Sequence, residues 1–130
     1  MKEISSSVIS IICTGCVYLL GGWDVSLICL VIVIALDYIS GVMKAFVMKS
    51  LSSKIGLYGL LKKIGLLLVV MLAVVVDRVT GNTGMIRNLV IYYFVANEGL
   101  SIIENLGQAG VPIPSSIKKA LKALKKESKC

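Results

Sequence analysis

Two apolar stretches of this sequence carry polar side chains at helical spacing. Asp37 lies in one of them, and Ser40 and Lys44 follow it three and seven positions later, near one face of a helix. These residue types could bind water or a neighbouring helix, but they form no nucleophile with a base. The chain has no histidine, which removes the commonest general base. We therefore expect no enzyme activity.

The second stretch has Asn97, Ser101 and Glu104 at positions i, i+4 and i+7, flanked by further polar residues. A charge in a membrane span costs about 2.5–3.5 kcal/mol, so it usually faces protein or water. These groups could pair inside one bundle, for example Asp37 with Lys44 or Glu98 with Arg87. Alternatively, several copies could surround a wet lumen, which we favour because four short helices have little interior. The residues predicted to line a pore or specify assembly are Asp37, Ser40, Lys44, Asn97, Glu98, Ser101, Glu104 and Asn105.

The composition is that of an integral membrane protein. The 130 residues are 57% hydrophobic, and the mean hydropathy is +0.92. Soluble domains are about 45–50% apolar even when glycine is included. A soluble fold of this size could not bury so much apolar surface.

Charge and cysteine content exclude two other classes of partner. The net charge is +7, but there is no zinc-finger spacing and no basic stripe interleaved with aromatic residues, so we expect no nucleic-acid binding. Cys13 and Cys16 form a CxxC pair inside an apolar segment without a second ligand pair. We interpret them as small apolar residues and expect no metal or cofactor.

Four stretches are candidate membrane spans, since a spanning helix needs about 20 mostly apolar residues. They cover residues 4–20, 25–46, 64–79 and 85–103. The first is the weakest because serines and a threonine dilute it, which leaves three spans as the alternative. The third has no polar stripe, so we place it toward lipid or as a scaffold. The fold class is an all-α integral membrane protein with about four transmembrane helices, with a transmembrane domain at 1–110 and a basic tail at 111–130.

The distribution of lysine predicts the orientation in the membrane. Lysines are concentrated in the segment after the second stretch and in the tail, and they are absent from the turn after the first stretch. By the positive-inside rule, the central loop and the C-terminus are cytoplasmic. The loop lysines in this interpretation are Lys44, Lys49, Lys54, Lys62 and Lys63.

The tail is predicted to form a basic amphipathic helix after Pro112 and Pro114. Ile117, Leu121 and Leu124 fall at i, i+4 and i+7 among lysines. Such a helix suits an anionic inner leaflet; the alternative is a solvated tail that only fixes topology. The predicted lipid-binding residues are Lys118, Lys119, Lys122, Lys125 and Lys126.

An ordered series of short motifs runs through most of the chain. It comprises 21–24 (GGWD), 37–41 (DYISG) with Lys44-Ala45, 51–53 (LSS), Gly56, Gly59, Lys62-Lys63, Asp77, Arg87, 96–105 (ANEGLSIIEN) and 110–114 (GVPIP). With these motifs the sequence resembles the phage-lysis and toxin-secretion holins of Gram-positive bacteria and their phages, the family that includes clostridial toxin-release holins.

The resemblance implies a function. A holin accumulates in the cytoplasmic membrane of the bacterial host and then forms homo-oligomeric, non-selective lesions. Through these an endolysin reaches the cell wall, or a toxin without a signal sequence leaves the cell. Its partners would be other copies of itself, anionic lipids and the cargo. The alternatives are a small proton-coupled multidrug-type exporter and an antiholin or membrane scaffold.

Overall fold

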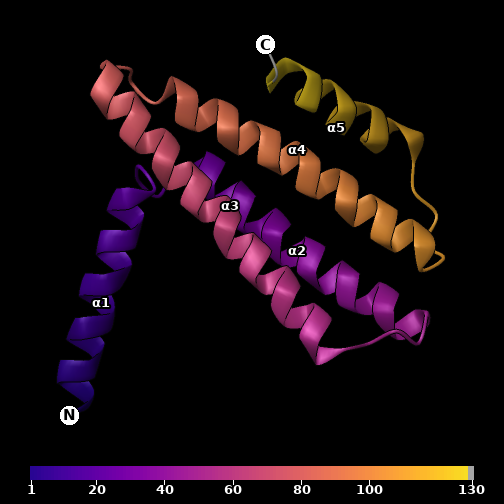
Figure 1. The fold of residues 1–130 in the computed structure, drawn as a ribbon. Helices are drawn as coiled ribbons and strands as arrows, with labels where there is room; N and C mark the ends of the chain where they lie inside the picture. The colour runs from indigo at the N-terminus through magenta and orange to yellow at the C-terminus, as the bar shows by residue number, and fades with distance from the viewer. Residues whose placement is uncertain (129–130) are drawn as a thin grey trace.

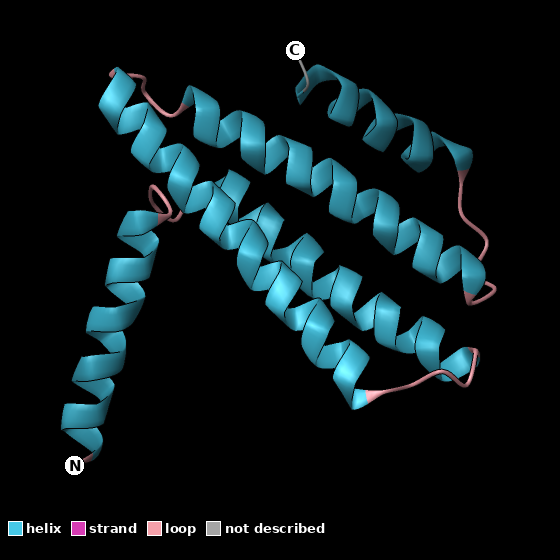
Figure 2. Cartoon of the chain, in the orientation of Figure 1, coloured by secondary structure: helices cyan, strands magenta, loops and turns pink. Residues whose placement is uncertain are grey.

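The computed structural model describes residues 1–128, which form five α-helices joined by short connections and contain no strand (Figures 1 and 2). Their bounds are α1 Lys2–Leu19, α2 Val25–Val47, α3 Ser53–Thr80, α4 Met85–Gln108 and α5 Ser115–Ser128. The all-helical fold class predicted from the sequence is confirmed.

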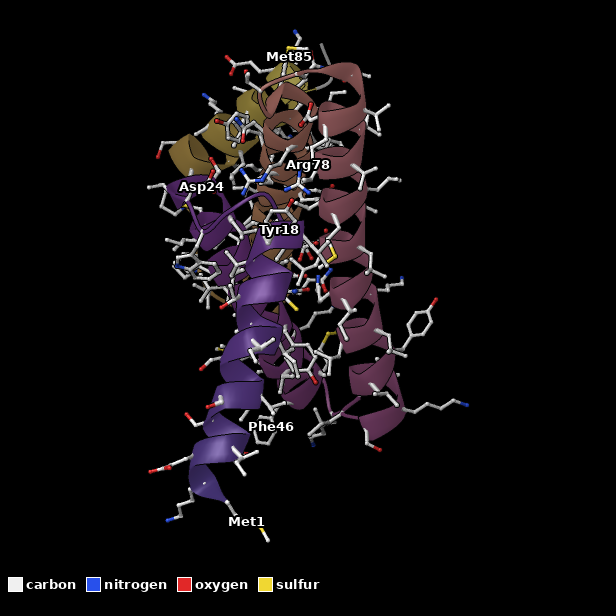
Figure 3. All side chains as sticks on the ribbon, turned by 90° about the vertical axis from the view of Figure 1, so that its left-hand side faces the viewer. Met1, Tyr18, Asp24, Phe46, Arg78 and Met85 are labelled. Carbon is white, nitrogen blue, oxygen red and sulfur yellow. The ribbon has the colours of Figure 1, made fainter. Side chains whose placement is uncertain are left out.

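Helices α2, α3 and α4 form a bundle in which α3 runs antiparallel to α2 and α4, and α4 packs against both of its partners (Figure 1). Helix α5 folds back along the outer side of α4, whereas α1 projects from the bundle as a separate arm (Figure 1). Tyr18, Asp24 and Arg78 lie toward the end of the molecule that carries Met85, and Met1 and Phe46 lie toward the other end (Figure 3). The turns before α2 and α4 therefore share one end of the bundle.

The buried apolar core is small. Its largest fully buried side chains are Leu27 and Leu30 from α2, Val70 from α3 and Ile91 from α4. Only 22% of the most apolar window of α2 and 17% of that of α3 are buried within the chain. The remaining apolar surface is far larger than a soluble monomer exposes, and it suits contact with lipid.

Three helices, α1, α2 and α3, are long and apolar enough to cross a membrane. Helix α4 has 24 residues and is about 36 Å long at 1.5 Å per residue, enough to span a hydrocarbon core of about 30 Å. Its mean hydropathy is below that of the other three helices because Arg87, Asn97 and Glu98 interrupt its apolar sequence. The sequence had indicated α1 as the weakest span, whereas the helix with the lowest average hydrophobicity of the four is α4.

Helix α3 begins at Ser53, well before the predicted start at residue 64. The placement of Lys54, Lys62 and Lys63 in a loop was therefore wrong, and so was that of Lys44, which lies in the last turn of α2. No proline interrupts this segment, and Ser52, in an extended conformation, precedes the first turn. The correction matters because it moves Lys63 onto the bundle face of a helix.

Candidate functional site

A charge network joins the three bundle helices where the two polar stretches meet. Lys63 of α3 forms ion pairs through its Nζ with Asp37 Oδ2 of α2 and with Glu98 Oε2 of α4. Both carboxylate side chains are 7% exposed, and that of Lys63 is 16% exposed. One ammonium group thus bridges two carboxylates, and the formal charge of the three groups is −1.

Amide and hydroxyl groups extend this network. Asn105 Nδ2 donates to Asp37 Oδ1 at 3.2 Å and to Ser40 Oγ at 3.1 Å. Ser40 Oγ in turn donates to the Asp37 carbonyl at 2.9 Å. Within residues 1–128, no buried side-chain nitrogen or oxygen lacks a hydrogen-bond partner. A single chain therefore satisfies these polar groups internally, which the sequence argument had considered difficult.

A cavity of about 230 Å³ leads to the network between α2 and α3. Asp37, Lys63, Ser101 and Asn105 line its polar side, and residues 50–52 of the α2–α3 loop lie along it. One water occupies about 30 Å³ in the liquid, so the space can hold several waters. Water entering from the loop end would hydrate Asp37 and Lys63 without opening the bundle.

The structure divides the predicted site residues of α4 between two faces. Glu98 and Asn105 point into the bundle, whereas Asn97 and Glu104 are exposed on the outer side. In the described chain, the pairs Asp37–Lys44 and Glu98–Arg87 are not formed, because Lys63 and Asp24 take those places. The network therefore unites Asp37, Ser40, Glu98 and Asn105, with Ser101 beside them in the cavity wall.

A second cluster fixes the turn between α1 and α2. Arg87 of α4 donates to both carboxylate oxygens of Asp24, at 2.7 and 3.0 Å. Its Nε donates to the Leu20 carbonyl at 2.6 Å, and its Nη2 donates to the Gly22 carbonyl at 3.1 Å. A planar guanidinium suits this set of acceptors, and lysine could not reproduce it. Arg87 thus holds the 20–24 turn against the start of α4.

Asp77 of α3 caps the neighbouring helix. Its Oδ1 accepts from the Ile86 backbone N–H at 3.0 Å, and its Oδ2 accepts from the Arg87 backbone N–H at 2.9 Å. The N-cap residue of α4 is Gly84, which has no side chain to do this. A carboxylate at a helix N-terminus is also favoured by the helix dipole. Asp77 therefore fastens the end of α3 to the beginning of α4.

Gly21 is predicted to be intolerant of any side chain. It has a φ of +86°, and a Cβ there would lie 2.5 Å from Arg87 Nε. We expect Gly21→Ala to lower the unfolding temperature in detergent more than Gly22→Ala does. Gly22 also has a positive φ, +109°, but no atom lies within 4 Å of its added Cβ, so its variant costs only the backbone strain of about 1–2 kcal/mol. Equal losses in the two variants would contradict the close packing of Arg87 on the turn.

Asp24 gives the turn a predictable pH dependence. Hydrogen bonds from the Arg87 guanidinium hold the pKa of this carboxyl below its ordinary value. A carboxyl with a lowered pKa stabilises the fold above its unfolded pKa, and the stabilisation is lost as pH falls through the folded pKa. We expect wild type to unfold at a higher temperature than Asp24→Asn at pH 7, with the difference shrinking below about pH 4. Glu3→Gln is the control, because Glu3 is exposed on α1; a pH-independent Asp24 effect would count against the ion pair.

Sequence reasoning missed Lys63, Asp24 and Asp77 as site residues. A signal was present for Lys63, because it immediately precedes the third apolar run and no helix breaker separates it from that run. Asp24 lies 63 positions from Arg87, and no local pattern connects the two. Asp77 appeared only in the motif series, without an assigned role.

The predicted lipid-binding lysines lie on α5, beside α4. Lys125 Nζ donates to Asn97 Oδ1 at 3.2 Å and lies 5.7 Å from the centre of the Tyr93 ring. Lys118 shares a cavity with Glu104 between the two helices. Binding of these lysines to anionic lipid remains a prediction.

Comparison with known proteins places the sequence in one group. The profile of the bacteriophage holin family matches residues 14–126. A 14.9 kDa protein of Clostridium perfringens is 50% identical over 109 residues, which are 82% of each chain. The YqxH protein of Bacillus subtilis is 40% identical over 112 residues, covering 85% of this chain and 79% of that protein.

A phage protein is also similar. A protein described as a probable holin, from Bacillus phage phi105, is 37% identical over 93 residues, covering 72% of this chain and 69% of its own. No solved structure matches. The profile match extends from within α1 to within α5, so it includes both charge clusters. The chain belongs to the bacteriophage holin family, as its sequence motifs had predicted.

Proposed function

We propose that this chain accumulates in the bacterial cytoplasmic membrane and oligomerises there into non-selective lesions that release an endolysin or a toxin without a signal sequence. The observation that carries the proposal is the Asp37–Lys63–Glu98 network at the centre of a holin-family bundle. Placing charged groups inside a membrane costs free energy. A lesion that lets a soluble protein through must be lined with water, and the charged groups of its subunits can face that water.

The network suits a protein that waits before it acts. In the monomer, Lys63 and Asn105 satisfy the carboxylates internally, so a single copy can reside in lipid without opening it. In the lesion, these polar faces exchange their internal partners for water or for a neighbouring copy. The same polar groups have hydrogen-bonding or charged partners in the monomer and in the lesion, so the two states can lie close in free energy.

The proposed topology follows the lysine distribution. Helices α1 to α4 cross the membrane, with the N-terminus, the α2–α3 loop and the C-terminus in the cytoplasm. The chain supports this alternation geometrically, since the turns before α2 and α4 lie at one end and the α2–α3 loop at the other (Figure 3). The lysines of α5 would then contact the anionic inner leaflet whenever the helix is free of α4.

Neutralising either carboxylate tests the role of the network. Asp37→Asn leaves Glu98 paired with Lys63, and Glu98→Gln leaves Asp37 paired with Lys63, so each variant retains one neutral pair. We expect both to accumulate in the membrane at wild-type levels while losing lysis. Immunoblots of membrane fractions and culture density are the measurements. Glu104→Gln, on the exposed outer side of α4, is the control for charge loss alone. Normal lysis in both network variants would remove these carboxylates from the lesion mechanism.

Release from vesicles tests the function itself. We expect the purified chain, reconstituted in phosphatidylethanolamine and phosphatidylglycerol vesicles, to release a small dye and a protein-sized dextran together. Equal release of both indicates a lesion large enough for an enzyme. Release that is restricted to the small dye, or that depends on a proton gradient, would contradict the proposal.

A further inference from the structure

The cavity between α2 and α3 lies where these two helices separate. The end of α2 and the start of α3 lie apart and are joined by the loop that contains residues 50–52 (Figure 1). Gly41 on α2 and Gly59 on α3 line the cavity and carry no side chain that could fill it. Residues of α4 form a third side. The space is therefore bounded by three helices and by the loop.

The cavity has a charged inner end and apolar walls. Asp37 and Lys63 line the inner end, and Glu98, outside the lining, bonds to Lys63. Two carboxylates and one ammonium group leave a formal charge of −1 at this end. Toward the loop, the apolar lining residues are Val42, Ala45, Leu51 and Ile55. The cavity thus combines an excess of negative charge with a hydrocarbon surface.

This combination selects one class of occupant. An excess of negative charge repels an anion and attracts a cation. Asp37 Oδ1 accepts one hydrogen bond, from Asn105, and a carboxylate oxygen can accept a second. A donor in the cavity can therefore bind there. The apolar walls cannot replace the water around an inorganic ion, whereas they suit a hydrocarbon chain. An ammonium group carried on a hydrocarbon chain matches both parts of the cavity.

The dimensions of the cavity favour a single unbranched chain. The distance along α2 from Asp37 to its last residue, Val47, is about 15 Å at 1.5 Å per residue. The volume of about 230 Å³ is that of roughly eight waters in the liquid. Such a volume spread over that length is narrow. It accommodates one short alkyl chain, and a phospholipid with two acyl chains is too large for it.

We propose that this cavity binds a primary ammonium ion on an unbranched hydrocarbon chain, with the ammonium group at Asp37 and the chain between α2 and α3. In the proposed topology the loop end of the cavity is cytoplasmic, so the ligand enters from that side. The bound cation brings the formal charge of the network to zero. Because the ligand occupies a space that three packed helices form, it stabilises this arrangement and delays the lesion. The delay rests on the proposed lesion-forming function, whereas the binding does not.

Equilibrium dialysis of radiolabelled hexylammonium tests the binding site. The purified chain in detergent is compared with protein-free micelles. Labelled hexanol and hexanoate are the matched probes, since they have the same chain without the positive charge. We expect saturable binding of one hexylammonium per chain, at least tenfold tighter than that of hexanol, and no saturable binding of hexanoate. Equal affinities for the three probes would overturn the proposal.

Two glycine variants of α3 show whether the ligand lies in the cavity. Gly59→Leu places a side chain in it, whereas Gly65→Leu lies outside its lining. No atom lies within 4 Å of an added Cβ at either position. We expect Gly59→Leu to abolish hexylammonium binding and Gly65→Leu to retain it. Undiminished binding by Gly59→Leu would contradict the assignment.

Removing one negative charge tests the electrostatic part of the site. We expect Asp37→Asn to weaken hexylammonium binding at least tenfold and to leave hexanol binding unchanged, which also verifies that the cavity is intact. Glu98→Gln makes the same change in net charge and answers the question if Asp37→Asn does not fold. Adding phosphatidylethanolamine to the micelles should not change the affinity. Competition by this lipid would assign the ammonium group to a headgroup and overturn the single-chain ligand.

Dextran release from vesicles tests the consequence of binding. We expect hexylammonium to slow release by the wild type at least threefold and to have no effect on Gly59→Leu. Unchanged release by the wild type at saturating hexylammonium would overturn the delay. If the chain releases no dextran without the amine, the proposed function fails, and the dialysis still decides whether the cavity binds the ammonium ion.

Discussion

We expect Lys63→Met to lower the free energy of unfolding in detergent by about 3–5 kcal/mol, the typical cost of removing one partner from a buried ion pair. Without the ammonium group, Asp37 and Glu98 face each other as two buried carboxylates with no cation between them. Insertion into the membrane should fail for the same reason. Denaturant or thermal unfolding in detergent, with immunoblots of membrane fractions, measures both effects.

The neighbouring residue provides the control. Lys62 is exposed on the same helix, with its Nζ 4.8 Å from the centre of the Tyr58 ring. Lys62→Met makes the same chemical change and should cost at most about 1 kcal/mol. The triple variant Asp37→Asn, Lys63→Met, Glu98→Gln should regain much of the lost stability, because no unpaired charge remains. Similar losses for Lys62→Met and Lys63→Met would contradict the network.

We expect Arg87→Lys to be almost as harmful as Arg87→Leu, with each lowering the free energy of unfolding by about 2–3 kcal/mol. A lysine ammonium cannot contact both oxygens of Asp24 and also the Leu20 and Gly22 carbonyls in the geometry of the guanidinium. The turn before α2 should then loosen. Protection of its backbone amides from hydrogen exchange, measured in detergent, would fall together with the unfolding temperature.

A second arginine at the same end is the comparison. Arg78 is exposed, donates to the Tyr18 carbonyl at 3.2 Å and lies 4.3 Å from the centre of the Tyr18 ring (Figure 3). Arg78→Lys should cost no more than about 1 kcal/mol. If Arg87→Lys is as stable as wild type, the bidentate contact with Asp24 does not hold the turn.

The sequence predicted the helices better than their contacts. Apolar length located α1, α2 and α4 closely, since a spanning helix must satisfy its own backbone. It misplaced the start of α3 because lysines were interpreted as loop residues, although a helix can carry them on a hydrated or paired face. Helical periodicity placed Asn97 on a polar stripe with Glu98 beside it and assigned both to pore lining or assembly, whereas in the structure Glu98 lies on the inner face of α4 and Asn97 on its outer face.

Pairing was beyond the reach of a single sequence. Lys63 lies 26 and 35 positions from its two carboxylates, and Arg87 lies 63 positions from Asp24. Which cation meets which anion depends on how the helices rotate and stagger when they pack, and local spacing does not contain that information. The same limit applies to α5, whose amphipathic pattern predicted an apolar edge without indicating that α4 would be its partner.

The most direct test of the central claim is induced expression in a bacterium, with and without a co-expressed cytoplasmic endolysin, following culture density and viability. A lesion-forming chain should cause abrupt lysis when both proteins are present, and loss of viability without lysis when it is expressed alone. Continued growth with the chain abundant in the membrane, in the presence of the endolysin, would contradict a lesion-forming function and favour an exporter or an inhibitory partner.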